Sequence, residues 1–183
     1  MNQSETRRIL ELVRGGELSV ADAVLKLKMQ PFEDIGFAKL DHHRALRQGV
    51  AEVIYGAGKT PGQISRIAAA MLAREKRTIL IARLSPEAAG VLQSSYPLHY
   101  HEIARMGVIG GLPAPDGIGK IVVATGGTSD MPVAEEAALT AEALGNTVVR
   151  IYDVGVAGLH RLLAHLDEIM SAKVIIAIAG MEG

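Results

Sequence analysis

Residues 120–130, KIVVATGGTSD, decide the fold of this chain. The four residues 121–124 are all apolar, which is typical of a parallel strand covered on both faces. Glycines, hydroxyls and a carboxylate follow over residues 125–130, and a helix is predicted over residues 131–144. A strand, a glycine-rich loop and a helix in this order indicate an open α/β sheet that binds an anion where the strand ends.

The same alternation continues to the end of the chain. A strand is predicted over residues 147–153, a helix over residues 159–170 and a strand over residues 174–179. Short connections in a β-α-β-α-β order predict a parallel sheet with right-handed crossovers. We therefore expect a parallel three-layer α/β/α unit of the flavodoxin-like class in residues 116–183, preceded by an N-terminal helical and small α/β region in residues 1–115.

The N-terminal region is patterned less regularly. Prolines interrupt it repeatedly between residues 85 and 115, where no regular element is predicted. The elements expected before that stretch are helices over residues 4–14 and from Ser19 onward, a strand over 51–55, a helix over 62–74 and a strand over 77–82.

Composition restricts the classes of function. The net charge is −1, so nucleic acid is not expected as a partner. Cysteine is absent from the 183 residues, which excludes disulfides and thiolate metal sites within them. No metal site is predicted. No apolar run is long enough to span a bilayer, and no leader-like segment opens the chain, so a cytoplasmic protein without a membrane partner is expected.

Three loops should meet at the carboxyl edge of the predicted sheet: residues 125–130, 153–158 and 180–183. In the first loop, glycines let backbone N–H groups approach an anion, and the following helix adds its positive end. An ordinary capped strand-to-helix turn is the alternative interpretation. The candidate phosphate- or sugar-binding residues are Thr125, Gly126, Gly127, Thr128, Ser129 and Asp130.

The second and third loops supply charged candidates. His160 and Arg161 lie off the leucine stripe of their helix, where Arg suits a phosphate or carboxylate and His suits proton transfer, unless they form only a solvated polar face. Gly155 and Gly158 precede them in the same loop. Glu182 follows the last predicted strand and would lie in the crevice.

Two further stretches look like known binding motifs but do not match them. The sequence around Lys59 is not a P-loop, because Val53 stands where the first glycine belongs. It is not a dinucleotide fingerprint either, because Pro61 occupies the final glycine position. His42 and His43 are adjacent and would diverge on a helix, so ion pairing is favoured there over metal binding.

Five motifs occur in order over nearly the whole chain: residues 40–44 (LDHHR), 52–60 (EVIYGAGKT), 127–137 (GTSDMPVAEEA), 153–161 (DVGVAGLHR) and 179–183 (AGMEG). Together they resemble the LarB family, which begins the synthesis of the nickel-pincer nucleotide cofactor. The second half is more distantly similar to the PurE-type aminoimidazole ribonucleotide carboxylases.

The resemblance implies a reaction. Nicotinic acid adenine dinucleotide would be carboxylated at C5 of its pyridinium ring by CO₂ or bicarbonate, and its phosphoanhydride would be cleaved to give pyridinium-3,5-biscarboxylic acid mononucleotide and AMP. Mg²⁺ is expected to assist at the diphosphate, and a homo-oligomer, an octamer, is implied.

The resemblance also implies residue roles. It makes Glu182, His160 and Asp130 the catalytic candidates, and it places Ser129 and Asp130 on the substrate and Arg161 near its ring and carboxyl groups. Asp41, Arg44 and Lys59 match motifs without an assignable role.

The chain departs from the family pattern in one respect. Family members continue beyond the last motif and carry a nucleophilic cysteine, which these 183 residues lack. A fragment of a longer protein or a truncated gene product is therefore expected. Two other hypotheses stay open: a PurE-like carboxylase or mutase of an aminoimidazole ribonucleotide, which needs no cysteine, and a non-catalytic nucleotide-binding or assembly subunit.

Overall fold

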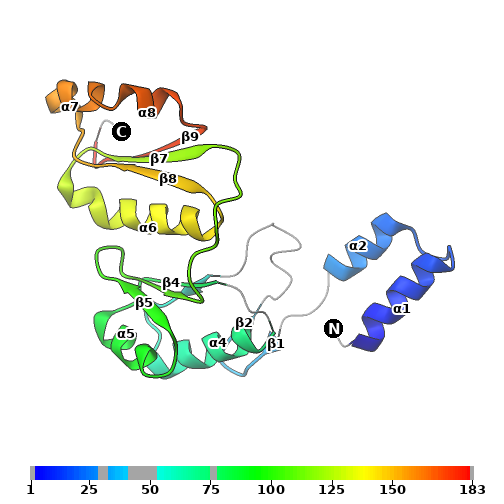
Figure 1. The fold of residues 1–183 in the computed structure, drawn as a ribbon. Coiled ribbons are helices and arrows are strands. Elements are labelled where there is room, and N and C mark those ends of the chain that lie inside the picture. Colours follow the sequence, from blue (N-terminus) through cyan, green and yellow to red (C-terminus); the bar gives the residue numbers. More distant parts are fainter. Residues whose placement is uncertain (1–2, 29–32, 41–52, 75–77, 182–183) are drawn as a thin grey trace. The chain divides into compact units, whose positions relative to one another are not determined.

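The computed structural model describes residues 3–28, 33–40, 53–74 and 78–181. Contacts within the chain divide it into two compact units, Met1–Glu52 and Val53–Gly183 (Figure 1). The boundary at residue 115 predicted from the sequence is a different subdivision and stays a prediction.

The first unit contains a helical hairpin and a two-stranded ribbon. Helix α1, Gln3–Arg14, and helix α2, Val20–Lys28, are separated by a turn in which Gly16 has a left-handed φ of 75°. The Ser19 hydroxyl oxygen accepts a hydrogen bond from the Asp22 N–H at 3.0 Å and so caps α2, as the sequence predicts. Strands β1, Glu33–Asp34, and β2, Lys39–Leu40, pair antiparallel.

The second unit begins with a four-stranded mixed sheet of order β3-β4-β6-β5. Strand β3 pairs parallel with β4, whereas β4, β6 and β5 are antiparallel neighbours. Helices α4 and α5 accompany these strands. The bounds are β3 Ile54–Tyr55, α4 Pro61–Arg74, β4 Ile79–Ala82, α5 Pro86–Gln93, β5 Leu98–His101 and β6 Met106–Ile109.

The regular structure between residues 85 and 115 corrects the sequence prediction. The Ser85 hydroxyl accepts a hydrogen bond from the Ala88 N–H at 3.1 Å, and Pro86 occupies the first helical position of α5. A proline at that position starts a helix because its missing N–H would have no partner there. The β5–β6 hairpin follows and depends on pairing with β4, a contact between distant residues that local patterning does not show.

The C-terminal half forms a three-stranded parallel sheet of order β8-β7-β9. The first strand in the sequence lies in the centre, which is the 2-1-3 order that opens a flavodoxin-like sheet. The predicted α/β flavodoxin-like class is thus confirmed. The bounds are β7 Lys120–Thr125, α6 Met131–Ala143, β8 Thr147–Ile151, α7 Leu159–Leu163, α8 Leu166–Met170 and β9 Val174–Ile178.

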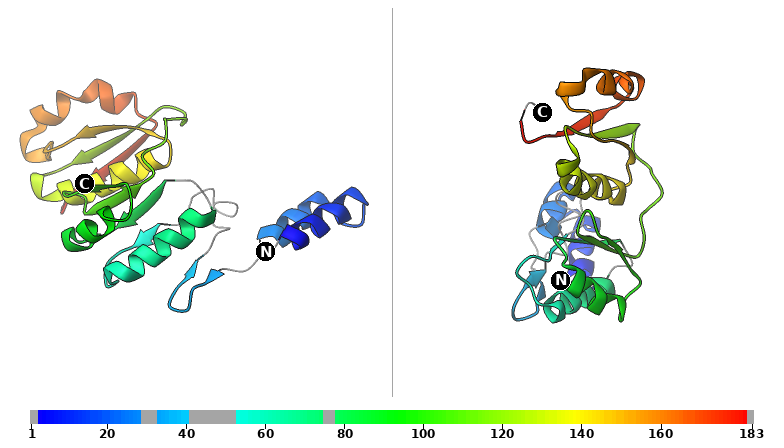
Figure 2. Two further views of the ribbon diagram at one scale, coloured as in Figure 1. Left: turned by 60° about the horizontal axis from the view of Figure 1, so that its bottom comes forward. Right: turned by 90° about the vertical axis from the view of Figure 1, so that its left-hand side faces the viewer.

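Helices cover both faces of this sheet, as Figures 1 and 2 show, with α6 on one face and α7 and α8 on the other. On the α6 face, Ala134 and Ala138 pack against Val123. On the other face, Leu162 and Ile169 pack against Val122. Both valines are fully buried, which explains why the strand reads as a continuous apolar run.

Helix α6 also contacts the mixed sheet. Its Leu139 is buried in a cluster with Leu80 of β4 and with Met106 and Val108 of β6. Ala134 and Ala138 face the parallel sheet, while Leu139 and Ala143 face the mixed one, so α6 is apolar on two sides. This helix therefore fixes the start of the candidate site to both sheets.

The predicted helix over residues 159–170 is two short helices. At the junction the N–H of His165 donates to the carbonyl of Leu162 at 3.0 Å, a bond to the residue three positions back. This tighter bond ends α7, and α8 begins at Leu166. Among the described residues, no helix is long and apolar enough to cross a bilayer.

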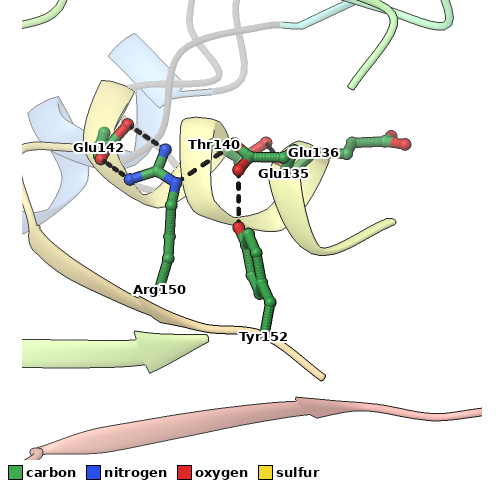
Figure 3. A network of polar contacts seen from close by, with 6 residues as sticks. All are labelled: Glu135, Glu136, Thr140, Glu142, Arg150 and Tyr152. Carbon is green, nitrogen blue, oxygen red and sulfur yellow. Dashed lines mark hydrogen bonds and ion pairs between the residues drawn. The ribbon is translucent and has the colours of Figure 1, made fainter. Parts of the chain in front are cut away.

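A polar network fastens the outer strand β8 to α6, as Figure 3 shows. The Arg150 guanidinium donates to both carboxylate oxygens of Glu142 and, from Nε, to Glu135 at 3.2 Å. Tyr152 donates its hydroxyl to the other oxygen of Glu135 at 2.8 Å. The guanidinium fork and the phenol thus satisfy two half-buried carboxylates.

Tyr152 is expected to make the free energy of unfolding fall as the pH rises into the alkaline range. Burial, and then the hydrogen bond to Glu135, raise the pKa of the Tyr152 phenol above its ordinary value of 10.0. The stability that the protonated Tyr152 phenol contributes to the folded state is complete below about pH 10. It is lost as the pH rises toward the raised pKa, because over that range the unfolded chain releases the phenol proton while the folded chain keeps it. We expect Tyr152→Phe to flatten the fall in urea midpoint between about pH 10 and pH 11. Equal slopes in both proteins would contradict this.

Candidate functional site

The candidate site lies at the carboxyl ends of β7 and β9, which stay paired up to Thr125 and Ile178. In open α/β sheets of this strand order, ligands bind at this edge of the sheet, beside the strand at which the order reverses. The Gly126 N–H donates to the carbonyl of Ile178 at 2.9 Å, so the loops after the two strands begin in contact. A Cβ at Gly126 would lie 3.0 Å from that of Ala179.

The first loop is closed by its own residues. The Gly127 N–H donates to Oδ2 of Asp130 at 3.0 Å, and the Asp130 N–H donates back to the Gly127 carbonyl. Thr128–Asp130 form a single 3-10 turn, and α6 starts at Met131. The hydroxyls of Thr128 and Ser129 are exposed and have no hydrogen-bond partner among the described residues. The loop therefore presents two free hydroxyls beside one carboxylate at the positive end of a helix.

Thr125, at the start of the first loop, accepts hydrogen bonds from the second loop. It is 1% exposed, and its hydroxyl oxygen accepts a hydrogen bond from the Asp153 N–H at 3.0 Å. Its carbonyl accepts one from the Val154 N–H at 3.0 Å. Gly155 then approaches so closely that a Cβ would lie 2.5 Å from the Gly126 carbonyl oxygen. These contacts join the first loop to the second, and the Gly126 bond to Ile178 joins it to the end of β9, two residues before the predicted third loop.

Asp153 holds Arg161 in place. Arg161 Nη1 donates to Asp153 Oδ2 at 2.6 Å, and the Arg161 side chain passes so close to Gly158 that a Cβ there would lie 2.6 Å from Nε. Asp153 has a left-handed φ of 58°, which Asp tolerates better than most residues. The Arg161 guanidinium has further N–H groups that can donate to a bound carboxylate or phosphate.

Sequence reasoning missed Asp153 as a site residue. Asp153 was placed at the end of a strand and at the start of the second loop, but it was not named as a site residue as Gly155, Gly158, His160 and Arg161 were. An aspartate just past a strand end, two residues before Gly155, was the available signal for a left-handed turn.

The other predicted site residues either make no described contact with these loops or lie outside the described residues. His160 is exposed on α7 beside Arg161. Lys59 donates from Nζ to the Tyr55 carbonyl at 2.7 Å within its own loop. Asp41, Arg44 and Glu182 lie outside the described residues, so their roles stay predictions. The described residues contain no cluster of three or more His, Asp or Glu side chains able to enclose a metal.

Comparisons with known proteins identify the family. Residues 32–111 match the LarB/PurE-like N-terminal domain, a stretch that contains the whole mixed sheet. An uncharacterized protein of Methanocaldococcus jannaschii is 36% identical over 188 residues, covering 97% of this chain and 73% of that relative. Together with the flavodoxin-like sheet and its glycine-rich crevice, these matches show that the chain belongs to the carboxylase-related LarB/PurE-like family.

Proposed function

We propose that the protein containing this chain carboxylates the pyridinium ring of nicotinic acid adenine dinucleotide at C5 and hydrolyses its phosphoanhydride. The products are pyridinium-3,5-biscarboxylic acid mononucleotide and AMP. The observation that carries the proposal is the pairing of two anion-binding features in one crevice. The hydroxyl-bearing loop suits the diphosphate, and Arg161, held by Asp153, suits a ring carboxylate.

The electronic demand of the reaction explains which groups are needed. A pyridinium carbon is electron-poor and does not attack CO₂. Addition of a thiolate to the ring gives a dihydropyridine whose C5 is nucleophilic. C5 then forms a bond to CO₂ and loses its proton, and departure of the thiolate restores the aromatic ring. The 183 residues contain no cysteine, so the thiol in this proposal is supplied from outside them.

The described residues would bind and orient the substrate. Thr128 and Ser129 can donate hydroxyl hydrogens to phosphate oxygens, and Arg161 can bind the carboxylate of the ring. His160, beside it, is the proposed proton carrier. Glu182 is the proposed base for the attack of water on the phosphoanhydride.

Mg²⁺ fits the donor set of the loop. This ion is commonly held by one or two carboxylates together with substrate phosphates rather than by a full protein cage. Asp130 supplies one carboxylate, of which Oδ2 already accepts from Gly127. Asp130 would hold the ion, and the ion would neutralise charge on the diphosphate.

The proposal is tested by incubating the full-length protein with nicotinic acid adenine dinucleotide, ¹³C-labelled bicarbonate and Mg²⁺. AMP and a labelled product one carboxyl group heavier than nicotinic acid mononucleotide should appear together. Ser129→Ala should raise KM because it removes a phosphate contact, whereas Ser95→Ala, an exposed serine of the mixed-sheet half, should not. Absence of both products would refute the proposal.

Asp153→Asn should separate substrate binding from stability. Asparagine keeps the left-handed backbone but loses the charge that holds Arg161. The ion pair is 39% and 47% exposed at its two side chains, so stability should change by less than about 1 kcal/mol. Calorimetric affinity for the dinucleotide should fall about tenfold, because Arg161 is no longer held. An unchanged affinity would show that Asp153 does not position Arg161.

A PurE-like reaction on an aminoimidazole ribonucleotide is the second candidate. Two observations favour it: the matched domain is shared with PurE-like proteins, and the 183 residues contain no thiol. The same crevice would bind one phosphate and the imidazole carboxylate. Turnover of the imidazole substrate without turnover of the pyridine dinucleotide would select this reaction.

A further inference from the structure

A second cavity lies on the side of α6 that faces the mixed sheet. Its volume is about 280 Å³, and three segments line it: the end of β4 at Arg83, the β5–β6 turn ending at Arg105, and the start of α6 at Pro132. Pro132 is two residues beyond Asp130, so the cavity adjoins the glycine loop through the first turn of the helix. No role has been given to it above.

Both arginines of this cavity have unusual backbone conformations. Arg83 has a φ of 53° and Arg105 a φ of 48°, in the left-handed region that non-glycine residues seldom occupy. They are tied together, because the N–H of Leu84 donates to the Arg105 carbonyl at 2.8 Å. Strained non-glycine residues that converge on one cavity are more common at functional sites than elsewhere.

The charges in the cavity leave one guanidinium available. Arg83 Nε forms an ion pair with a carboxylate oxygen of Glu136 of α6 at 3.2 Å, so these two charges offset each other. Arg105 has no ion pair with any described residue. Glu102, in the same turn, also lines the cavity and is exposed to solvent. The Arg105 guanidinium, which is in no ion pair with a described residue, lies beside the first turn of α6, whose positive end also favours an anion.

We propose that this cavity is a second anion site, which binds a phosphate group through Arg105 and Arg83 at the start of α6. The inference rests on the cavity and its charges and does not depend on the proposed function. The phosphate belongs either to the nucleotide that occupies the glycine loop on the other side of the helix start or to a separate phosphate-bearing molecule.

Thermal unfolding of the full-length protein tests the site. The midpoint is measured in phosphate and in chloride at equal ionic strength, because a ligand that binds only the folded state raises it. Arg105→Asn removes the guanidinium and keeps a residue that tolerates the left-handed backbone. Arg8→Gln removes one positive charge from α1 as a matched control, and Ser129→Ala perturbs the glycine loop instead.

The expected result is a phosphate-induced rise that Arg105→Asn largely loses and that Arg8→Gln retains in full, whereas Ser129→Ala loses only the part that the glycine loop contributes. Without phosphate, Arg105→Asn should unfold no earlier than the parent, because the strain at this position is eased. Arg83→Asn should also lose the response, which provides a second variant if the first folds poorly. The proposal is overturned if the parent shows no rise, or if Arg105→Asn keeps it.

Calorimetry then identifies the source of the phosphate. If it belongs to the nucleotide in the crevice, Arg105→Asn should weaken binding of nicotinic acid adenine dinucleotide about tenfold and leave inorganic phosphate little bound. If it belongs to a separate molecule, dinucleotide affinity should stay unchanged while the phosphate response is lost. Loss of the phosphate response in Ser129→Ala alone would place the anion on the glycine loop and overturn the inference.

Discussion

Replacing Gly155 by alanine is expected to disrupt the crevice and to lower the free energy of unfolding by roughly 2–3 kcal/mol. The added Cβ would lie 2.5 Å from the Gly126 carbonyl oxygen and 3.2 Å from its carbonyl carbon. These are backbone atoms, so no side-chain rotation relieves the clash, and the first two loops must separate. Urea unfolding measures the stability loss, and calorimetry should show no binding of the dinucleotide.

Gly180→Ala is the matched control in the third loop. A Cβ at Gly180 meets no atom of the described residues within 4 Å, so alanine should leave both stability and binding nearly unchanged. If Gly155→Ala behaved like Gly180→Ala, the close packing of the first two loops would not determine the site. If both variants lost binding equally, the third loop would matter more than its open surroundings indicate.

Replacing Arg150 by methionine should cost about 2 kcal/mol of stability and leave the crevice intact. Methionine keeps the apolar stem but removes the donors that Glu135 and Glu142 share, so half-buried Glu142 loses its partner and Glu135 keeps only the Tyr152 hydroxyl (Figure 3). The side chains of Arg150 and Glu142 are 29% and 22% exposed, which keeps the cost below that of a fully buried pair. Urea unfolding of the parent protein and of Arg150→Met measures this loss of stability.

A double-mutant cycle with Glu142→Gln isolates the coupling between the two side chains. The double variant should be more stable than the sum of the two single losses predicts, because Arg150→Met leaves the Glu142 charge unpaired and Glu142→Gln removes one of the two carboxylates that pair with Arg150. Glu168→Gln is the comparison, since it removes a more exposed ion pair with Lys120 and should cost less than about 1 kcal/mol. Equal losses in Arg150→Met and Glu168→Gln would contradict the structural role of the network.

Local patterning predicted the parallel half of the fold well. Strand β7 has buried valines on both faces, and that double burial produces the continuous apolar run from which it was predicted. The mixed sheet was not predicted in full, because β5 and β6 are stabilised by pairing with β4 more than by their own pattern. A strand whose partner is distant in sequence leaves a weak local signal.

The sequence by itself determined that a glycine-rich loop follows a buried strand and precedes a helix, because those properties depend on neighbouring residues. It also located Arg161 near the same edge of the sheet. Only the tertiary structure decided how these parts are held in place. Asp153 binds Arg161, the Thr125 hydroxyl accepts a hydrogen bond from the second loop, and Gly155 packs closely against Gly126. Such contacts join residues up to 29 positions apart, as Gly126 and Gly155 are, and their geometry arises when β7 and β8 align in the sheet.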